Sequence, residues 1–508
     1  MLEGVDTVPG VYPGISPTKI SGTQKPRKYL TMGQYICDDN MTTHNNSLNN
    51  LIRGVGERVL FTDKNCTQRV LPTSANVFER RCGVYKRMVA RRLGFQSPVS
   101  RQQFVDYYKG RRRTTYQLAA DGLALKPVRV LDSHLSTFIK AEKLNFTIKP
   151  DPAPRVIQPR SARYNVEVGK YLLPLEHKIY DEIDNLFESP TVMSKYNAIG
   201  QANVIVDKWN SFVDPVCVGL DASRFDQHVS QQALKFEHGL YDLVFKSAEL
   251  RKLLRWQLTN TGHARAAEGK FSYKTKGSRM SGDMNTSLGN KILMCLMSLA
   301  YIKSKTNIRI AFVNNGDDCL MFLEKKNLSQ INDLEQYFLD FGFKIVREPP
   351  VLEIEQIEFC QCKPLLVNGT WRMVRNIKTC LLKDVTAVNL GHDTDMYRHW
   401  LSDVANCGAA FAKDVPVLGA FYTMLRRFGK EGNYHGKDAE FSCYRTLSKN
   451  VHIPFTSPDP YGRYSFWKQT GIHPDAQEEL ENYFKNSVWG GDKRQFIENY
   501  SYIIQNGS

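Results

Sequence analysis

Residues 308–323 read IRIAFVNNGDDCLMFL, two apolar runs around an Asn-Gly pair and two acids. Asn-Gly between apolar runs is the strongest short-range hairpin signal, because both central residues of such a turn must tolerate positive φ. We therefore predict a β-hairpin with Asp317 and Asp318 where the turn enters its second strand. Adjacent carboxylates repel one another unless a cation lies beside them, so the tip is a candidate divalent-metal site. The alternative is a solvated loop, in which such acids are common.

The composition describes a folded, strongly basic protein. The 508 residues are 42% hydrophobic and 11% aromatic, and their net charge is +16. This charge favours a polyanionic partner, either nucleic acid or an anionic membrane surface, and a generally basic solubilised surface is the alternative. Eleven dispersed cysteines without zinc-ligand spacing suit reduced thiols in a cytosolic protein. No secretory signal is visible, and the longest apolar runs, residues 292–302 and 415–425, are too short to span a bilayer.

Residues 78–129 combine many cations with interleaved aromatic side chains. The densest group of cations is Arg111, Arg112 and Arg113. The interleaved aromatic residues are Tyr85, Phe104, Tyr107, Tyr108 and Tyr116. Cations that follow phosphates and aromatics that stack on bases are what single-strand binding requires, so the segment is a candidate nucleic-acid surface. A helical pair with a solvated basic face and an aromatic core is the alternative.

A proline-rich segment follows, KPDPAPRVIQPR at residues 149–160. Its first three prolines exclude a helix and favour an extended, stiff strand or loop that presents Arg155 and Arg160. An arginine fork suits a triphosphate, because it donates two parallel hydrogen bonds. Surface salt bridges from an extended loop are an equally good interpretation.

The run VCVGLDASRFDQH, residues 216–228, predicts a short buried strand that ends at Asp221. An acid at the end of a buried strand can reach a metal placed over the sheet edge. Asp226, five residues further on, can face the same cavity. A helical pattern continues over residues 229–243, so Asp226 is alternatively an ordinary N-cap.

A polar motif, SGDMNTSLGN at residues 281–290, opens a long apolar helix. Ser281 and Gly282 give a flexible elbow before that helix. Thr286 and Asn290 are four residues apart and therefore lie on one face. Together they can read one substrate group, such as a ribose hydroxyl, or they can be satisfied by neighbouring backbone.

The remaining elements complete an alternation of strands and helices. We predict helices over residues 172–187, 328–341, 414–428 and 477–484, and strands over residues 343–347 and 357–364. This order makes a small antiparallel sheet backed by helices, an α+β fold in which Asp221 lies beside Asp317 at the sheet edge. Carboxylates there can bridge two divalent cations, one activating a primer 3′-hydroxyl and one escorting a triphosphate.

In this order the motifs resemble the palm of viral RNA-dependent RNA polymerases, most closely the tombusvirus-like family of positive-strand RNA plant viruses. Residues 221–228, 281–290 and 315–319 look like motifs A, B and C, and residues 343–344, 359–363 and 154–160 look like motifs D, E and F. The resemblance covers residues 76–390 and is most specific in motifs A to C and F. It implies a right-hand polymerase with fingers, palm and thumb.

The resemblance also implies domain boundaries. Residues 76–215 would be basic fingers, 216–245 the palm with motif A, 246–280 further fingers, 281–375 the palm with motifs B to E, and 376–508 a helical thumb. Residues 1–75, rich in Gly, Pro, Thr and Asn with little periodicity, would be an irregular N-terminal lead-in.

By resemblance, Asp221 and Asp317 would hold two Mg²⁺ or Mn²⁺ ions, with Asp318 in support. Lys344, in motif D, is a candidate general acid for the leaving pyrophosphate. A plain surface residue on a strand is the other interpretation of Lys344.

The substrate residues carried over are those that would contact a nucleotide. Asp226, Thr286 and Asn290 would select the ribose 2′-hydroxyl, the group that separates RNA from DNA substrates. Arg155 and Arg160 would bind the incoming triphosphate.

Ser281 and Gly282 would form the flexible loop that helps the template to translocate. The expected partners are the RNA template, the nascent RNA, NTPs, a viral auxiliary replication protein and host factors. Replicases of this family usually carry an N-terminal membrane anchor that this sequence does not show, as expected for the polymerase part of a longer readthrough or frameshift product. We therefore expect the chain in the host cytoplasm, at membrane-associated replication complexes, through a region or partner outside this sequence.

Two other functions compete with RNA synthesis on an RNA template. A reverse transcriptase shares the palm, but it usually blocks the 2′-hydroxyl with a bulky side chain where this chain has Asp226 with Asn290. An RNA-binding replication scaffold with an inactive palm is the second alternative, and the presence of every expected carboxylate argues against it.

Overall fold

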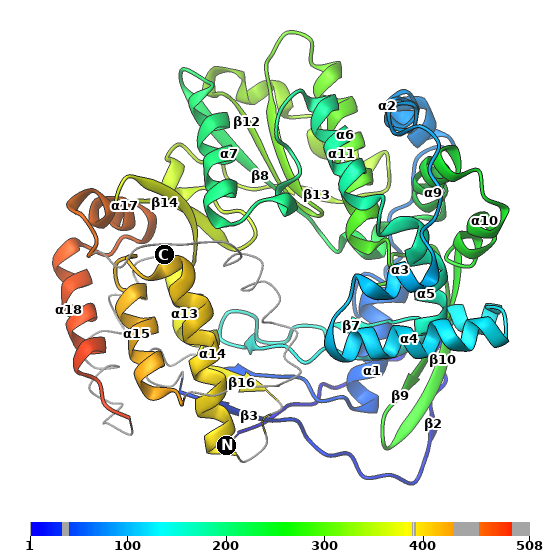
Figure 1. Cartoon of the computed structure of the whole chain (residues 1–508), viewed down its shortest axis with the longest axis horizontal. Helices are drawn as coiled ribbons and strands as arrows, with labels where there is room; N and C mark the ends of the chain where they lie inside the picture. The colour runs from blue at the N-terminus through cyan, green and yellow to red at the C-terminus, as the bar shows by residue number, and fades with distance from the viewer. Residues whose placement is uncertain (1, 33–39, 389, 391–392, 431–456, 490–508) are drawn as a thin grey trace.

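The computed structural model describes residues 2–32, 40–388, 390, 393–430 and 457–489. Its helices and strands are arranged in three groups around the middle of the view in Figure 1. One group is built on a four-stranded sheet, one on a five-stranded sheet with several helices, and one is mainly helical. This mixed content confirms the predicted α+β class.

The four-stranded sheet carries the predicted acids and is antiparallel throughout. Its order is β11 (Ala311–Asn315), β12 (Asp318–Glu324), β8 (Pro215–Ala222) and β13 (Ile345–Arg347). Helices cover both faces, because Val218 belongs to a core that includes α6, α9 and α11, whereas Cys217 belongs to another core that includes α7. The four helices are α6 (Glu176–Phe187), α9 (Gln231–Phe245), α11 (Thr286–Ser304) and α7 (Ala198–Asn210). The predicted antiparallel sheet backed by helices is therefore confirmed.

The hairpin of β11 and β12 forms, but its turn lies one residue later than predicted. Asn315 pairs with Asp318, so the two central residues are Gly316 and Asp317 rather than Asn-Gly. Of these two, Gly316 has the positive φ, +87°, as in turns with glycine at the first central position. The reason lies in the buried amide of Asn314, which accepts from the Gly316 N–H at 3.0 Å and donates to the Gly316 carbonyl at 2.7 Å.

The second group combines several helices with a five-stranded sheet of order β2-β10-β9-β5-β7, on which α1 (Leu48–Val55) packs. The strands are β2 (Thr18–Lys19), β10 (Gly269–Lys276), β9 (Thr259–Arg265), β5 (Leu135–Ile139) and β7 (Val156–Ile157). The helices are α2 (Val77–Leu93), α3 (Arg101–Asp106), α4 (Gly110–Leu125), α5 (Ala162–Leu172) and α10 (Ala248–Arg255). The proline-rich segment thus contributes an edge strand, β7, as its extended character predicts.

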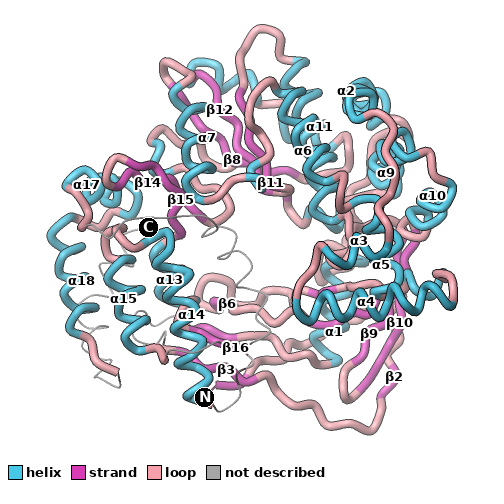
Figure 2. Tube along the Cα trace, in the orientation of Figure 1, coloured by secondary structure: helices cyan, strands magenta, loops and turns pink. Residues whose placement is uncertain are grey.

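The third group is mainly helical and has its own hydrophobic core. Its helices are α13 (Ile377–Lys383), α14 (Thr394–Ala412), α15 (Leu418–Phe428), α17 (Pro460–Thr470) and α18 (Pro474–Asn486). Figure 2 shows these helices side by side, next to the hairpin of β14 (Cys362–Val367) and β15 (Thr370–Arg375). The predicted helices over residues 414–428 and 477–484 correspond to α15 and α18.

Three predicted elements differ in the structure. The helix predicted over residues 172–187 begins later, at Glu176, because Pro174 separates α6 from α5, which ends at Leu172. The helix over residues 328–341 is a 3₁₀ helix that ends at Ile331, followed by α12 (Leu334–Leu339). The strand over residues 357–364 is displaced to β14, which continues through Pro364 because a two-stranded sheet has an outer edge that needs no N–H donor.

The N-terminal segment joins the other groups instead of standing apart from them. β1 (Leu2–Glu3), β3 (Lys28–Thr31) and β16 (Thr386–Val388) form one sheet, whereas β2 pairs with β10. α1 (Leu48–Val55) continues into a π-helix at Gly56–Leu60. The segment is thus less irregular than predicted. Within the described part of the chain, no helix is both long and apolar enough to cross a bilayer.

Candidate active site

Three acids meet at one end of the four-stranded sheet. The register pairs Leu220 of β8 with Cys319 of β12, so the next position along places Asp221 beside Asp318. Asp317 lies in the adjoining turn, and all three carboxylates reach solvent. The strand topology therefore brings Asp221 and Asp317 to the same end of the sheet, as predicted, and adds Asp318 directly beside Asp221.

The charges at this end of the sheet are unbalanced. Partial desolvation raises the pKa of Asp318, and the charges of Asp317 and Asp221 raise it further. Desolvation also raises the pKa of Asp226, with a smaller contribution from Asp317, while the Asn290 hydrogen bond opposes the rise. Like charges are thus held together in a partly desolvated place, which is typical of a functional site.

Glu348 is an additional acid that sequence reasoning missed. It follows β13 by one residue, and its side chain lies against Gly219, where there is no Cβ to exclude it. Its pKa is raised by desolvation and by the charges of Glu358, Asp221 and Asp318. The signal in the sequence was its position at the end of the strand that pairs with Asp221.

The donor set at this end suits a hard divalent cation. Carboxylate oxygens are the ligands that Mg²⁺ and Mn²⁺ prefer, and a bound cation would relieve the mutual repulsion of the acids. Asp221, Asp317 and Asp318 are the residues that would hold it. Among the described residues, no three His, Cys, Asp or Glu side chains are already gathered closely enough to hold an ion.

Asp226 and Asn290, which are 64 positions apart, are joined by a hydrogen bond. Asn290 Nδ2 on α11 donates to Asp226 Oδ1 at 2.7 Å. Asp226 lies in the short helix α8 (Phe225–His228), and the following helix α9 is capped by Ser230. The N-cap interpretation of Asp226 is therefore wrong. The pair presents a carboxylate and an amide side by side, close to Asp317.

The Thr286 side chain is satisfied by neighbouring backbone, which is one of the two interpretations of its motif. Its hydroxyl donates to the backbone carbonyls of Met280 and Asp283, at 2.7 and 2.9 Å. The proton of this hydroxyl is therefore used within the protein, and its oxygen remains an acceptor.

Ser281 and Gly282 lie against the proline-rich segment. Gly282 forms a parallel bridge with Pro159, and a Cβ at Gly282 would collide with the Pro159 backbone. The Ser281 hydroxyl accepts a hydrogen bond from the Gln158 N–H at 3.1 Å. The elbow before α11 is thus tied directly to the segment that carries Arg155 and Arg160.

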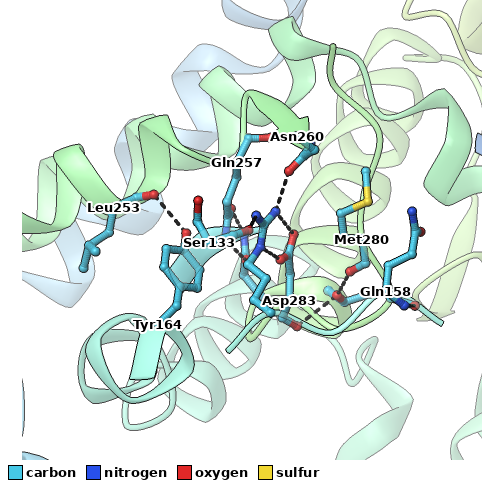
Figure 3. A network of polar contacts seen from close by, with 12 residues as sticks. Ser133, Gln158, Tyr164, Leu253, Gln257, Asn260, Met280 and Asp283 are labelled. Carbon is cyan, nitrogen blue, oxygen red and sulfur yellow. Dashed lines mark hydrogen bonds and ion pairs between the residues drawn. The ribbon is translucent and has the colours of Figure 1, made fainter. Parts of the chain in front are cut away.

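Arg160 is buried in that connection and does not face solvent. Its guanidinium forms an ion pair with Asp283, donates to Asn260 Oδ1 at 2.7 Å and to the Ser133 carbonyl at 2.6 Å. Figure 3 labels Ser133, Asn260 and Asp283 within this network of polar contacts. Only 1% of the Arg160 side chain is exposed, so the placement argues against the predicted triphosphate contact. The proline-rich sequence predicted a presented cation and could not show that Asp283 would bury it.

Arg155, five residues earlier, is placed quite differently. Its side chain is 55% exposed and pairs with Glu142 at 3.3 Å. The charge of Arg155 opposes the rise in the pKa of Asp226 that desolvation causes, so Arg155 lies within electrostatic reach of the site. Arg155 therefore makes an ion pair, and its contact with a triphosphate stays a prediction.

Two further cations near Arg155 were missed by sequence reasoning. Arg58 donates to the Ala153 carbonyl at 3.0 Å, and its pKa is lowered to about 10 by burial and by the charges of Arg224 and Arg155. Arg224 donates to the carbonyls of Glu57 and Thr62. Arg224 could have been found from its position between the two motif A acids, whereas nothing around Arg58 points to the site.

Comparison with known proteins decides the family. The model of a protein family described as Viral RNA dependent RNA polymerase matches residues 16–489 of this chain. The chain belongs to this family. Similar proteins include the RNA-directed RNA polymerases of Turnip crinkle virus, Pothos latent virus and Tomato bushy stunt virus, which are 42%, 40% and 38% identical over 87%, 93% and 86% of this chain. The chain spans 58%, 64% and 53% of these relatives, and the predicted resemblance to tombusvirus-like polymerases is confirmed.

Lys344 stands where the resemblance predicts motif D, directly before β13. Its side chain is exposed, and its charge contributes to lowering the pKa of His228. Its carbonyl accepts from the Ser223 N–H at 3.0 Å, which ties the start of β13 to the loop after Asp221. Both interpretations of Lys344 stay open.

The basic segment over residues 78–129 folds into three helices, α2, α3 and α4, rather than a helical pair. Arg111, Arg112 and Arg113 are exposed on α4, where Arg113 pairs with Asp106 at 3.0 Å. Of the aromatic residues, Phe104 and Tyr116 are buried and pack on each other and on Tyr108, while Tyr107 is 57% exposed. Base stacking by Phe104 and Tyr116 is therefore excluded in this arrangement, and the three arginines remain available to phosphates.

Proposed function

We propose that this chain synthesises RNA on an RNA template from NTPs, as the polymerase part of the replicase of a positive-strand RNA plant virus. The observation that supports this best is the convergence of Asp221, Asp317 and Asp318 at one end of an antiparallel sheet. Asp226, bonded to Asn290, lies near enough for the charge of Asp317 to raise its pKa. Membership of the polymerase family supports the same function.

We propose a right-hand layout for the three groups of elements. The four-stranded sheet and its helices would be the palm, residues 216–245 and 281–375. The five-stranded sheet and its helices would be the fingers, residues 76–215 and 246–280, and the C-terminal helices the thumb, residues 376–508. Residues 389, 391–392, 431–456 and 490–508 of that range lie outside the described residues.

Phosphoryl transfer needs mainly positioning and charge neutralisation. Two Mg²⁺ or Mn²⁺ ions, when bound, would activate the 3′-hydroxyl and neutralise the triphosphate. Asp221 and Asp317 would hold them, with Asp318 in support. Arg155 would exchange its ion pair with Glu142 for a phosphate of the incoming nucleotide. Arg160 is better assigned a positioning role, because its ion pair with Asp283 fixes the base of α11.

The remaining predicted residues take secondary roles in this proposal. Asp226 would accept a hydrogen bond from the ribose 2′-hydroxyl, and Asn290 and Thr286 would contribute to the same selection. Ser281 and Gly282 would move with the template. Lys344 would donate a proton to the leaving pyrophosphate.

A polymerase assay with purified protein tests the proposal. We expect NTP incorporation that requires an RNA template and Mg²⁺, measured with and without a primer. Asp317→Ala should lose incorporation and still retain RNA. A scaffold with an inactive palm would give the same result for the variant and the parent in both assays, whereas incorporation of dNTPs as readily as NTPs would favour a reverse transcriptase.

The partners proposed for the whole replicase are the RNA template, the nascent RNA, a viral auxiliary replication protein and host factors. We propose that it works in the host cytoplasm, at membrane-associated replication complexes. Attachment to the membrane would come through a region or partner other than the described helices.

A further inference from the structure

A buried ion pair lies directly behind Asp226 and Asn290. Arg279, in the loop before α11, pairs with Glu237 of α9 at 2.5 Å, and both side chains are fully buried. Burying two charges costs several kcal/mol per ion unless geometry and further hydrogen bonds offset the cost. Arg279 Nη1 has no hydrogen-bond partner among the described residues, so part of this cost is not offset within the pair.

The guanidinium of Arg279 fixes how the Asn290 amide is turned. Arg279 Nε donates to Asn290 Oδ1 at 3.0 Å, and Asn290 Nδ2 donates to Asp226 Oδ1 at 2.7 Å. Arginine has donors and no acceptor, and an ionised carboxylate has acceptors and no donor. A flipped amide would therefore face donor with donor and acceptor with acceptor. Only one orientation of Asn290 is compatible with both neighbours.

Arg279 also holds the backbone of the partner acid. The backbone N–H of Arg279 donates to the backbone carbonyl of Asp226 at 2.7 Å. With Oδ1 of Asp226 occupied by Asn290, the second oxygen, Oδ2, has no hydrogen-bond donor among the described residues. It is this oxygen that remains to accept a substrate hydroxyl.

Glu237 anchors the guanidinium from behind. It accepts hydrogen bonds from Asn285 Nδ2 at 2.7 Å and from the Tyr241 hydroxyl at 2.8 Å. A Cβ at Gly289 would collide with both Arg279 and Glu237, so glycine there permits the close approach of α11. The pair is therefore locked between α9 and the first turn of α11.

We propose that Arg279 and Glu237 are positioning residues that set the discrimination between ribose and deoxyribose. Arg279 orients the Asn290 amide, the amide occupies one oxygen of Asp226, and the other oxygen is left to read the 2′-hydroxyl. The inference rests on the proposed polymerase function and deepens it. A site built to pair a substrate hydroxyl rejects the analogue that lacks it, and the rejection weakens when the reading groups are free to turn.

The test compares kcat/KM for an NTP with kcat/KM for the matching dNTP. Arg279→Lys keeps the charge but cannot reach Asn290 and Glu237 together, because it lacks the planar fork. We expect the NTP-to-dNTP ratio to fall about tenfold, mainly through better use of the dNTP. The matched control is Arg372→Lys, since Arg372 is equally buried, pairs with Asp414 at 2.5 Å and also has one nitrogen without a partner.

The double variant Arg279→Met/Glu237→Met is the second test, because it leaves no charge buried and unpaired. It should fold and show the same fall in the ratio. An unchanged ratio in a folded double variant, or an equal fall in Arg372→Lys, would overturn the inference while leaving the polymerase function intact. A parent that incorporates no NTP would remove the function itself, and this inference with it.

Discussion

The acid end of the sheet and the buried network behind it treat charge in opposite ways. At the acid end, Asp221, Asp317 and Asp318 reach solvent, and none of them forms an ion pair with a described residue. In the network, Arg279 and Glu237 are fully buried and matched to each other. A bound cation would relieve the repulsion among the three acids, whereas the ion pair of Arg279 and Glu237 fixes the geometry of its neighbours. Substitutions in the two regions should therefore separate activity from stability.

The largest effect is expected at the acid end. Asp317→Asn should lower NTP incorporation by at least about a thousandfold, because positioned charge supplies most of the catalysis of phosphoryl transfer. The melting temperature without divalent cations should stay equal to that of the parent or rise, since one repelling charge is gone. Thermal unfolding and incorporation are measured on the same preparation. Asp207→Asn, at an exposed position of α7, is the control, and a destabilised but active Asp317→Asn would reverse the comparison.

The network should show the opposite pattern. Glu237→Ala leaves the Arg279 charge buried and unpaired, which is expected to lower the free energy of unfolding by about 3–5 kcal/mol. Urea denaturation followed by circular dichroism measures the loss. The double variant Arg279→Met/Glu237→Met should recover most of it. If the single variant is as stable as the double, the buried charge is not what the network is balancing.

Arg155 and Arg160 allow the same contrast within one segment. Arg160→Ala should lower the free energy of unfolding by about 3 kcal/mol, because it leaves Asp283 buried without its partner. Arg155→Ala should lower stability much less, since Arg155 is 55% exposed and Lys140 still pairs with Glu142 at 3.6 Å, and it should raise KM for NTPs by about tenfold. Steady-state kinetics and urea denaturation on both variants decide this. Equal losses of stability would mean that exposure does not distinguish the two arginines.

The smallest effect is expected far from both regions, on the basic face of α4. Changing Arg111, Arg112 and Arg113 together to Gln should weaken template binding several-fold at low salt and flatten its salt dependence. Arg251→Gln is the control, because Arg251 is exposed and pairs with Asp242 at 2.7 Å on another surface. Fluorescence anisotropy with labelled RNA over a salt series gives the slopes. An unchanged slope for the triple variant would place these arginines off the RNA path.

Local patterns were enough to predict the sheet that carries the acids. The apolar runs before Asp221 and around Asp317 each specify a strand, and Asn290 follows from helical spacing. Whether Asp221 and Asp317 reach the same end of the sheet depends on the strand register. The short connections of an antiparallel sheet leave little freedom to change that register. The family resemblance then supplied roles that no single motif could.

Long-range pairing was beyond reach from the sequence. Nothing near Arg160 shows that Asp283, 123 residues later, would bury it. The same holds for Arg279, whose partner Glu237 reads as one more polar position on a helix. The turn was misplaced by one residue because the Asn314 side chain, rather than backbone preference alone, decides where Gly316 lies. Side-chain contacts of this kind depend on the finished fold.

The N-terminal strands also limit how far the molecule can open. β2 is paired with β10 of the five-stranded sheet, and β3 is paired with β16 beside the C-terminal helices. Residues 20–27 between them are the whole link, and a stretch of that length spans at most about 30 Å when fully extended. This short tether sets a contour length for any outward swing of one group from the other. A wider separation would require β2 or β3 to dissociate from its sheet. Opening beyond this length would therefore break backbone hydrogen bonds, and a hinge rotation alone would not allow it.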